Sequence, residues 1–211
     1  MPYITVQGPG QAEIVVKKSR FIASVAPART DEEAWAFIEQ IRGEHKEATH
    51  NCFAFKAGAG QRLSDDGEPS GTAGRPIFDV IDKQGLSDTV VVVTRYFGGI
   101  LLGAGGLVRA YSQAAVAGVE AAGVATAVLA VDFRLSLDYP LVGKVQYLLE
   151  QRNALTLNTE FGQDVVIDCR LLAEQADGLE AALAEASAGR IKAERLQELQ
   201  VATNLRPIHG E

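Results

Sequence analysis

The chain has 211 residues, of which 47% are apolar and 22% charged, and its formal net charge at pH 7 is -7. This composition excludes disorder along the whole chain, and the acidic balance excludes a nucleic-acid binder that relies on a uniformly basic surface. The apolar runs fall short of the roughly 20 residues that a membrane span needs, and no signal peptide is visible. We therefore expect a cytoplasmic protein without a membrane partner.

The first elements of the chain are two strand-like segments within residues 14–25. They flank a basic corner that contains Lys17, Lys18 and Arg20. A cationic corner beside an aromatic residue, here Phe21, suits nucleic acid, although a solvated strand end has the same composition. Both interpretations stay open at this point.

A helix is predicted over residues 31–43. Thr30 suits the N-cap position, and Glu33 three residues later completes a capping box. A strand follows over residues 51–56. Residues 58–76 are rich in glycine and proline, which predicts a long loop that is either functional or mobile.

A continuous run of β-branched residues over 89–94 predicts a central strand that is buried on both faces. A glycine-rich turn then leads into a long helix that ends at about Ala122. The expected apolar side of this helix comprises Leu107, Tyr111, Ala114, Ala115, Gly118 and Val119. Its small residues indicate close packing on a sheet.

The second half of the chain predicts the order β-α-β-β-α-β, which is the ferredoxin-like pattern. Its first strand alternates apolar and polar residues over 131–137, and small apolar residues over 123–130 mark the expected boundary. The fold class is therefore α+β with two domains, residues 1–125 and 126–211.

The acidic loop over residues 64–74 is the first candidate site. Asp65, Asp66 and Glu68 could hold a hard cation such as magnesium and serve a metal-dependent hydrolase, although their spacing is not that of an EF-hand. Carboxylates that bond their own backbone in a turn explain the same pattern. In a third interpretation, the backbone N–H groups of residues 71–74 form an anion nest.

The glycine-rich turn between the buried strand and the long helix is the second candidate site. A helix N-terminus with free N–H groups favours anions, and Arg95 and Arg109 flank the turn. The glycines that would let a phosphate backbone approach are Gly98, Gly99, Gly105 and Gly106. Tight packing of the helix onto the strand explains these glycines equally well. Neither a dinucleotide-binding nor a P-loop motif is present, so we expect no cofactor.

Evidence for catalysis is weak. His50 and Cys52 would share one face of a strand, but no third group is evident to orient such a pair. We therefore favour a binding role over an enzyme. The predicted phosphate-binding residues are Lys17, Lys18, Arg20, Arg75, Arg95, Gly98, Gly99, Gly105, Gly106 and Arg109.

Three segments of the chain resemble the N-terminal domain of the IMPACT family. They are residues 17–22, residues 64–74, and the segment from Arg95 to Tyr111. The second half is similar to the C-terminal domain of the bacterial YigZ type of this family, on shorter strings such as Asp138-Tyr139.

The resemblance implies an N-terminal ribosomal-protein-like βαβ sandwich and a ferredoxin-like C-terminal domain. The same two fold types stand side by side in a translocating elongation factor, which suggests RNA or the ribosome as the partner. Eukaryotic relatives restrain a translation-control pathway through a protein partner, but they carry a different accessory domain. The expected function is thus translation-associated regulation, with a protein-interaction scaffold on the second domain's exposed sheet face as an alternative. The resemblance supplies no catalytic residue.

Overall fold

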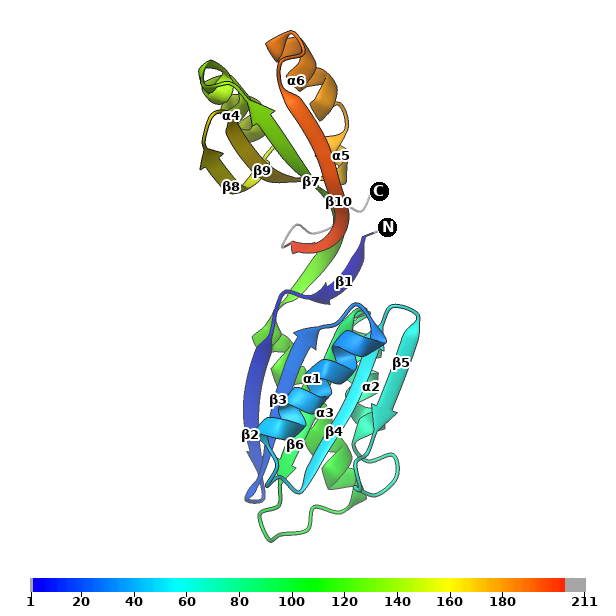
Figure 1. The fold of residues 1–211 in the computed structure, drawn as a ribbon. Helices are drawn as coiled ribbons and strands as arrows, with labels where there is room; N and C mark the ends of the chain where they lie inside the picture. Colours follow the sequence, from blue (N-terminus) through cyan, green and yellow to red (C-terminus); the bar gives the residue numbers. More distant parts are fainter. Residues whose placement is uncertain (1, 204–211) are drawn as a thin grey trace. The chain divides into compact units, whose positions relative to one another are not determined.

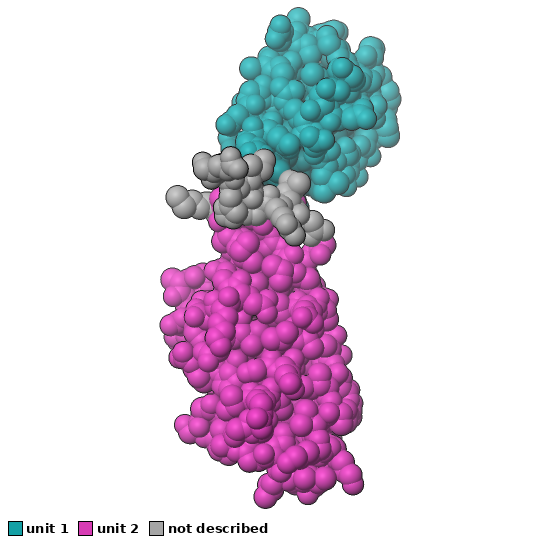
Figure 2. All heavy atoms as spheres, turned by 180° about the vertical axis from the view of Figure 1, so that it is seen from behind, with its two compact units in different colours: residues 1, 128–201 teal, residues 2–127, 202–211 magenta. Residues whose placement is uncertain are grey.

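The computed structural model describes residues 2–203, which form two compact units. Figure 2 colours the N-terminal unit, residues 2–127, and the C-terminal unit, residues 128–201. The α+β class with two domains is confirmed. The units divide inside a single strand, between Ala127 and Val128.

The N-terminal unit is built on a five-stranded sheet in which each neighbouring pair is antiparallel. In spatial order its strands are β2 (Gly10–Val16), β3 (Ser19–Pro27), β6 (Thr89–Tyr96), β4 (His50–Ala57) and β5 (Gly60–Ser64).

Helices cover both faces of this sheet (Figure 1). One apolar cluster contains residues of α2 (Gly74–Lys83) and α3 (Ala104–Ala122), and a second contains residues of α1 (Asp31–Glu44). Val91 and Val93 of the central strand belong to the first cluster, and the alternating Val90 and Val92 belong to the second. The predicted strand buried on both faces is therefore confirmed. Within residues 2–203, no helix has the length and apolar character needed to cross a membrane.

Helix α1 begins at the predicted cap. The Thr30 hydroxyl accepts a hydrogen bond from the Glu33 backbone N–H at 3.2 Å. The Glu33 carboxylate accepts one from the backbone N–H of Arg29 at 2.7 Å, one residue earlier than a standard capping box would predict. The acidic side chains in the first turn also suit the positive end of the helix dipole.

The basic corner is a two-residue hairpin turn between β2 and β3. Val16 pairs with Ser19, and Lys17 and Lys18 between them have φ angles of 47° and 67°. Positive φ at both central positions is the geometry of a type I′ turn, where Asn-Gly is preferred. Both lysines are exposed. The turn therefore presents two adjacent cations in a backbone conformation that lysine rarely adopts.

The prediction of a loop over residues 58–76 was wrong for two parts of that range. Gly60–Ser64 forms the edge strand β5, which pairs with β4, and helix α2 already begins at Gly74. Sequence patterns missed the strand because it lies at the sheet edge, where its side chains face solvent and show no apolar alternation.

The C-terminal unit confirms the ferredoxin-like order. Its strand order is β10-β7-β9-β8, with the strands of the hairpin, β8 and β9, on one side of β7. The elements are β7 (Val124–Leu137), η1 (Tyr139–Leu141), α4 (Val142–Gln151), β8 (Leu155–Phe161), β9 (Val165–Leu172), α5 (Ala173–Ala176), α6 (Leu179–Ser187) and β10 (Lys192–Thr203). The first four residues of β7 pair with β1 (Tyr3–Val6) in the N-terminal unit.

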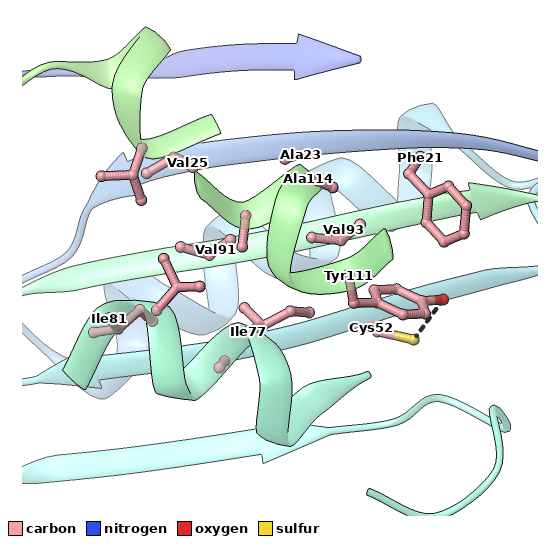
Figure 3. Packing of buried hydrophobic residues seen from close by; sticks show 14 of the residues in the cluster. Phe21, Ala23, Val25, Cys52, Ile77, Ile81, Val91, Val93, Tyr111 and Ala114 are labelled. Carbon is pink, nitrogen blue, oxygen red and sulfur yellow. Dashed lines mark hydrogen bonds between the residues drawn. The ribbon is translucent and has the colours of Figure 1, made fainter. Parts of the chain in front are cut away.

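The small residues of α3 allow this helix to approach the sheet closely, as predicted. Figure 3 shows the cluster on this side, to which Ala114 of α3 and Ala23 and Val25 of β3 belong. A Cβ atom added at Gly118 would lie 2.7 Å from the Ala23 Cβ and 2.9 Å from Val25 Cγ2. No side-chain carbon fits there unless the helix or the strand moves.

We expect Gly118→Ala to destabilise the N-terminal unit by about 1–3 kcal/mol, because overpacking displaces the helix from the strand. Gly105→Ala on the same helix is the matched control, since nothing lies within 4 Å of its added Cβ. The control should be neutral or stabilising by up to about 1 kcal/mol. Urea unfolding measures both changes, and equal stability of the two variants would contradict this account of α3 packing.

Candidate functional site

A buried ion pair joins two of the sequence segments singled out above. The Arg95 guanidinium, at the end of β6, donates from Nη1 to Oε1 of Glu68 at 2.6 Å. Both side chains are almost completely buried, with exposed fractions of 6% and 3%. Each charge depends on the other, because removing one partner of a buried pair costs roughly 3–5 kcal/mol.

Two further side chains complete the cluster around this pair. The Tyr111 hydroxyl of α3 donates to the same Glu68 oxygen at 2.7 Å. Arg95 Nη2 donates to the Ser19 hydroxyl oxygen at 3.4 Å, and that oxygen also accepts the Gly98 backbone N–H at 3.1 Å. The cluster thus connects β3, the acidic loop, β6, the glycine-rich turn and α3.

Aromatic rings enclose the Arg95 guanidinium. Its carbon lies 5.4 Å from the Phe21 ring centre and 5.5 Å from that of Phe97, distances typical of cation–π contacts. Phe21 in turn meets Tyr111 edge to face at 5.2 Å. Within residues 2–203, the buried Arg95 Nε has no hydrogen-bond partner.

The hydrogen-bond partner of His50 determines its neutral tautomer. Nδ1 lies 2.7 Å from the Asp66 carbonyl oxygen, which can only accept, so Nδ1 carries the proton. In the neutral ring Nε2 is then an acceptor, and it lies 3.8 Å from Oε2 of Glu68. Two acceptors therefore face each other at a separation longer than a hydrogen bond.

A cavity of about 420 Å³ opens beside this cluster. Thr49, His50, Glu68 and Arg95 provide its polar side chains, and Gly103 and Ala104 at the start of α3 also line it. Its apolar lining consists of Pro69, Phe97, Leu101, Leu102 and Leu107. The volume falls in the range of small-ligand sites.

The acidic loop has a structural role in the described part of the chain. The Asp65 carboxylate accepts backbone N–H groups from Gly71, Ala73 and Gly74 at 2.8–3.0 Å. Burial raises its pKa, but these three hydrogen bonds outweigh that effect and hold the pKa below the ordinary value. The turn interpretation is therefore the one that the geometry supports.

The three carboxylates of the proposed metal site do not converge. Asp65 accepts backbone hydrogen bonds from its own loop, and Asp66 accepts one from the Asn51 backbone N–H at 2.6 Å. Glu68 forms the ion pair with Arg95. Within residues 2–203, no group of three or more His, Cys, Asp or Glu side chains is arranged to hold a metal ion. The backbone N–H groups of Gly71, Ala73 and Gly74 donate to Asp65, so this carboxylate already occupies the expected anion nest.

Cys52 does not form a catalytic pair with His50. Its Sγ lies 3.0 Å from the Asp65 carbonyl oxygen and 3.4 Å from the Tyr111 hydroxyl, the contact drawn in Figure 3. Burial raises the pKa of the Cys52 thiol well above its usual value. The group is therefore a protonated core thiol and not a nucleophile.

The predicted cationic residues have different environments. Lys17, Lys18 and Arg109 are exposed, and none of the three has an ion-pair partner among residues 2–203. Arg20 forms a two-pronged bond with Glu13 at 2.8 and 2.9 Å. Arg95, which we expected to contact phosphate, is instead buried near the end of β6, where it pairs with Glu68 and its guanidinium lies over the Phe97 ring.

Arg75 is exposed and forms an ion pair with Asp79 one helical turn later at 2.7 Å. It does not line the cavity.

The four predicted glycines also differ in their surroundings. A Cβ atom at Gly98 would lie 2.0 Å from the Lys18 carbonyl carbon. Only glycine therefore lets the loop after β6 pack against the Lys17–Lys18 turn. Gly99 has a φ of 82°. Gly105 has open space around it, while a Cβ at Gly106 would contact the Leu102 side chain at 3.0 Å. Packing thus explains Gly98, whereas Gly105 leaves backbone accessible.

Sequence reasoning missed the polar roles of Ser19 and Tyr111 and the cavity lining by Thr49 and His50. Tyr111 was assigned to the apolar side of its helix, which is correct for its ring but not for its hydroxyl. The sequence signal for the polar role of Tyr111 is its position within the segment from Arg95 to Tyr111 that resembles the family.

The exposed sheet face of the C-terminal unit carries cross-strand ion pairs. Arg134 pairs with Asp168 at 2.8 Å, and Arg170 pairs with Asp132 at 2.7 Å. A scaffold of the expected kind requires an apolar patch on this face. The charged pairs occupy β7 and β9, whereas Leu155 of β8 and Leu196 of β10 are 59% and 45% exposed, so the scaffold alternative stays a prediction.

We expect Tyr111→Phe to destabilise the N-terminal unit by about 1.5–3 kcal/mol, because it removes a hydrogen bond to a buried carboxylate and keeps the ring. Tyr147→Phe is the control, since Tyr147 is 60% exposed. Urea unfolding tests both. If Tyr111→Phe left the free energy of unfolding unchanged, the hydrogen bond from Tyr111 to Glu68 would not stabilise the fold.

The Asp65 hydrogen bonds predict an acid-dependent stability. Because the folded pKa lies below the ordinary 3.8, this carboxylate stabilises the fold fully above 3.8 and progressively less as pH falls through the folded pKa. Asp65→Asn should cost about 1–3 kcal/mol at neutral pH. The difference from the unmodified protein should shrink in acid, and a pH-independent difference, measured by urea unfolding across pH, would contradict this role.

Two family models match the chain. The Impact N-terminal domain matches residues 17–119, and a domain of unknown function, DUF1949, matches residues 135–190. The first match contains the four side chains of the buried cluster, Ser19, Glu68, Arg95 and Tyr111, and also Phe21.

Similar proteins include curated bacterial relatives and a solved structure. The IMPACT family member YvyE of Bacillus subtilis strain 168 is 39% identical over 96% of this chain and 95% of its own length. The IMPACT family member YigZ of Escherichia coli K12 is 36% identical over 87% of this chain and 92% of its own length. A crystal structure of a hypothetical protein matches with a TM-score of 0.60 and 32% identity, covering 93% of this chain and 98% of that one. The chain therefore belongs to the IMPACT family.

Proposed function

We propose that this protein is a translation-associated regulator that binds single-stranded RNA, free or within the ribosome. Its RNA-binding surface would consist of the Lys17–Lys18 turn, the adjoining loop over residues 97–103 and the first turn of α3. The observation that carries the proposal is the contact between this cationic turn and a loop with exposed aromatic and aliphatic side chains.

The turn and the loop lie against each other at one end of the N-terminal unit. The Gly98 backbone packs on the backbone of Lys18 and Ser19. In the same loop, Phe97 is 46% exposed and Leu101 is 82% exposed. Cations beside exposed ring and apolar surface are the two elements that bind a single strand, through phosphates and through the faces of unstacked bases.

Backbone N–H groups at the start of α3 add to this surface. The first turn of a helix leaves N–H groups without helical partners, and they favour anions. Gly103 caps this helix without a side-chain hydrogen bond within residues 2–203, and Gly105 is exposed with open space around it. Exposed Arg109 lies in the second turn of the same helix.

A place in translation control is supported by membership of the IMPACT family, whose eukaryotic members act in that process. The local character of the cationic surface agrees with a net charge of -7, because a few phosphate contacts do not need a basic domain. The dispersed carboxylates of the acidic loop favour binding over metal-dependent hydrolysis.

The test measures binding of fluorescent single-stranded RNA, duplex RNA and purified ribosomes by the unmodified protein and by Lys17→Asn/Lys18→Gly. This double variant removes both cations and installs the residues that a type I′ turn prefers, so the hairpin should become more stable. For single-stranded RNA, the slope of log affinity against log salt should decrease in magnitude by about 1.4 when two phosphate contacts are lost.

Lys83→Gln/Lys192→Gln is the matched control, because it removes the same charge from exposed positions on α2 and β10. It should leave the salt slope unchanged. Absence of binding to any RNA or to ribosomes at low salt would overturn the proposal and favour a protein partner. An equal loss of RNA affinity in both double variants would show that net charge, and not the lysine turn, determines binding.

A further inference from the structure

We propose that the cavity beside the Arg95–Glu68 pair binds one unstacked nucleobase that carries an exocyclic amino group. This inference rests on the proposed RNA binding and names the chemical group recognised at the same surface. The cavity would select the base, while the lysine turn outside it would hold the phosphates.

The shape and lining of the cavity suit a flat ring. Its volume of about 420 Å³ can hold a purine or a pyrimidine, and its apolar wall includes the exposed Phe97 and Leu101. Aromatic and aliphatic walls bind the faces of an unstacked base, which leaves the polar base edge to find partners deeper in the site.

An amino group matches the polar end of the cavity. Oε1 of Glu68 already accepts hydrogen bonds from Arg95 and Tyr111, and Oε2 lies 3.8 Å from His50 Nε2, which is an acceptor when the ring is neutral and Nδ1 donates to the Asp66 carbonyl oxygen. An –NH₂ group placed between them can donate one hydrogen to each. A carbonyl edge, as in uracil, would instead add a third acceptor.

Two features of Arg95 indicate that the cluster is more than a structural ion pair. Arg95 lines the cavity and is 95% buried, yet its Nε has no partner in the described part of the chain. Buried donors are nearly always paired, so an unpaired donor in a side chain that lines a cavity is an exception that a purely structural ion pair does not explain. The free N–H groups at the start of α3, at Gly103 and Ala104 of the cavity lining, suit the phosphate of the bound nucleotide.

The experiment compares short uridine-rich RNAs that differ at one central nucleotide. Two pairs differ only by the amino group: guanosine against inosine, and adenosine against purine riboside. An abasic RNA reports the binding due to phosphates alone. We expect at least one pair to show a preference of roughly fivefold or more for the amino-bearing base, in line with base-edge discrimination elsewhere.

Ala104→Phe fills the cavity from an exposed position on its rim, outside the buried ion pair. It should abolish the amino-group preference, measured as the ratio of the two affinities within each pair. Ala36→Phe, at an exposed position of α1, is the control and should keep the preference. Urea unfolding verifies that both variants remain folded.

The outcomes separate this inference from the function on which it rests. Equal binding within both pairs, together with salt-dependent binding that the lysine variant weakens, would overturn the base site and leave RNA binding intact. A preference that persists in Ala104→Phe would place base recognition outside the cavity and also overturn it. No binding to any RNA would instead refute the proposed function.

Discussion

The Glu68–Arg95 ion pair is the interaction on which the rest of the N-terminal site depends. Neither charge can remain buried alone, so the acidic loop must close onto the end of the central strand. Tyr111 joins the long helix to the same carboxylate, and Ser19 joins the hairpin to the same guanidinium. One electrostatic requirement thus holds together four segments that are distant in sequence.

This arrangement explains why the loop and the turn keep their shapes. Asp65 folds the acidic loop over its own backbone N–H groups, which places Glu68 where Arg95 needs it. Gly98 brings the next loop against the Lys18 backbone at a distance that no side chain allows. The exposed lysines and the exposed Phe97 are therefore fixed beside each other by groups that are themselves buried.

The two units show different relations between charge and burial. In the N-terminal unit the central ion pair is enclosed, with a cavity beside it and an unpaired donor on Arg95. In the C-terminal unit the guanidinium groups of Arg134 and Arg170 stay partly exposed on the outer sheet face, although Asp132, the partner of Arg170, is itself buried. Among the ion pairs of residues 2–203, only Arg95–Glu68 has both side chains enclosed and a cavity beside it, and for this reason the proposed recognition lies in the first unit.

The sequence by itself determined the elements whose signals are local: the Thr30 cap, the doubly buried strand over residues 89–94, the small-residue face of α3 and the ferredoxin-like order. It also singled out the three segments that form the site. Only the tertiary structure decided that Arg95 is an interior partner of Glu68, that Asp65 braces a turn and that β5 is an edge strand. The physical reason is that periodicity and capping act over a few residues, whereas the pairing of a buried charge depends on which side chains the fold brings within 3 Å of it.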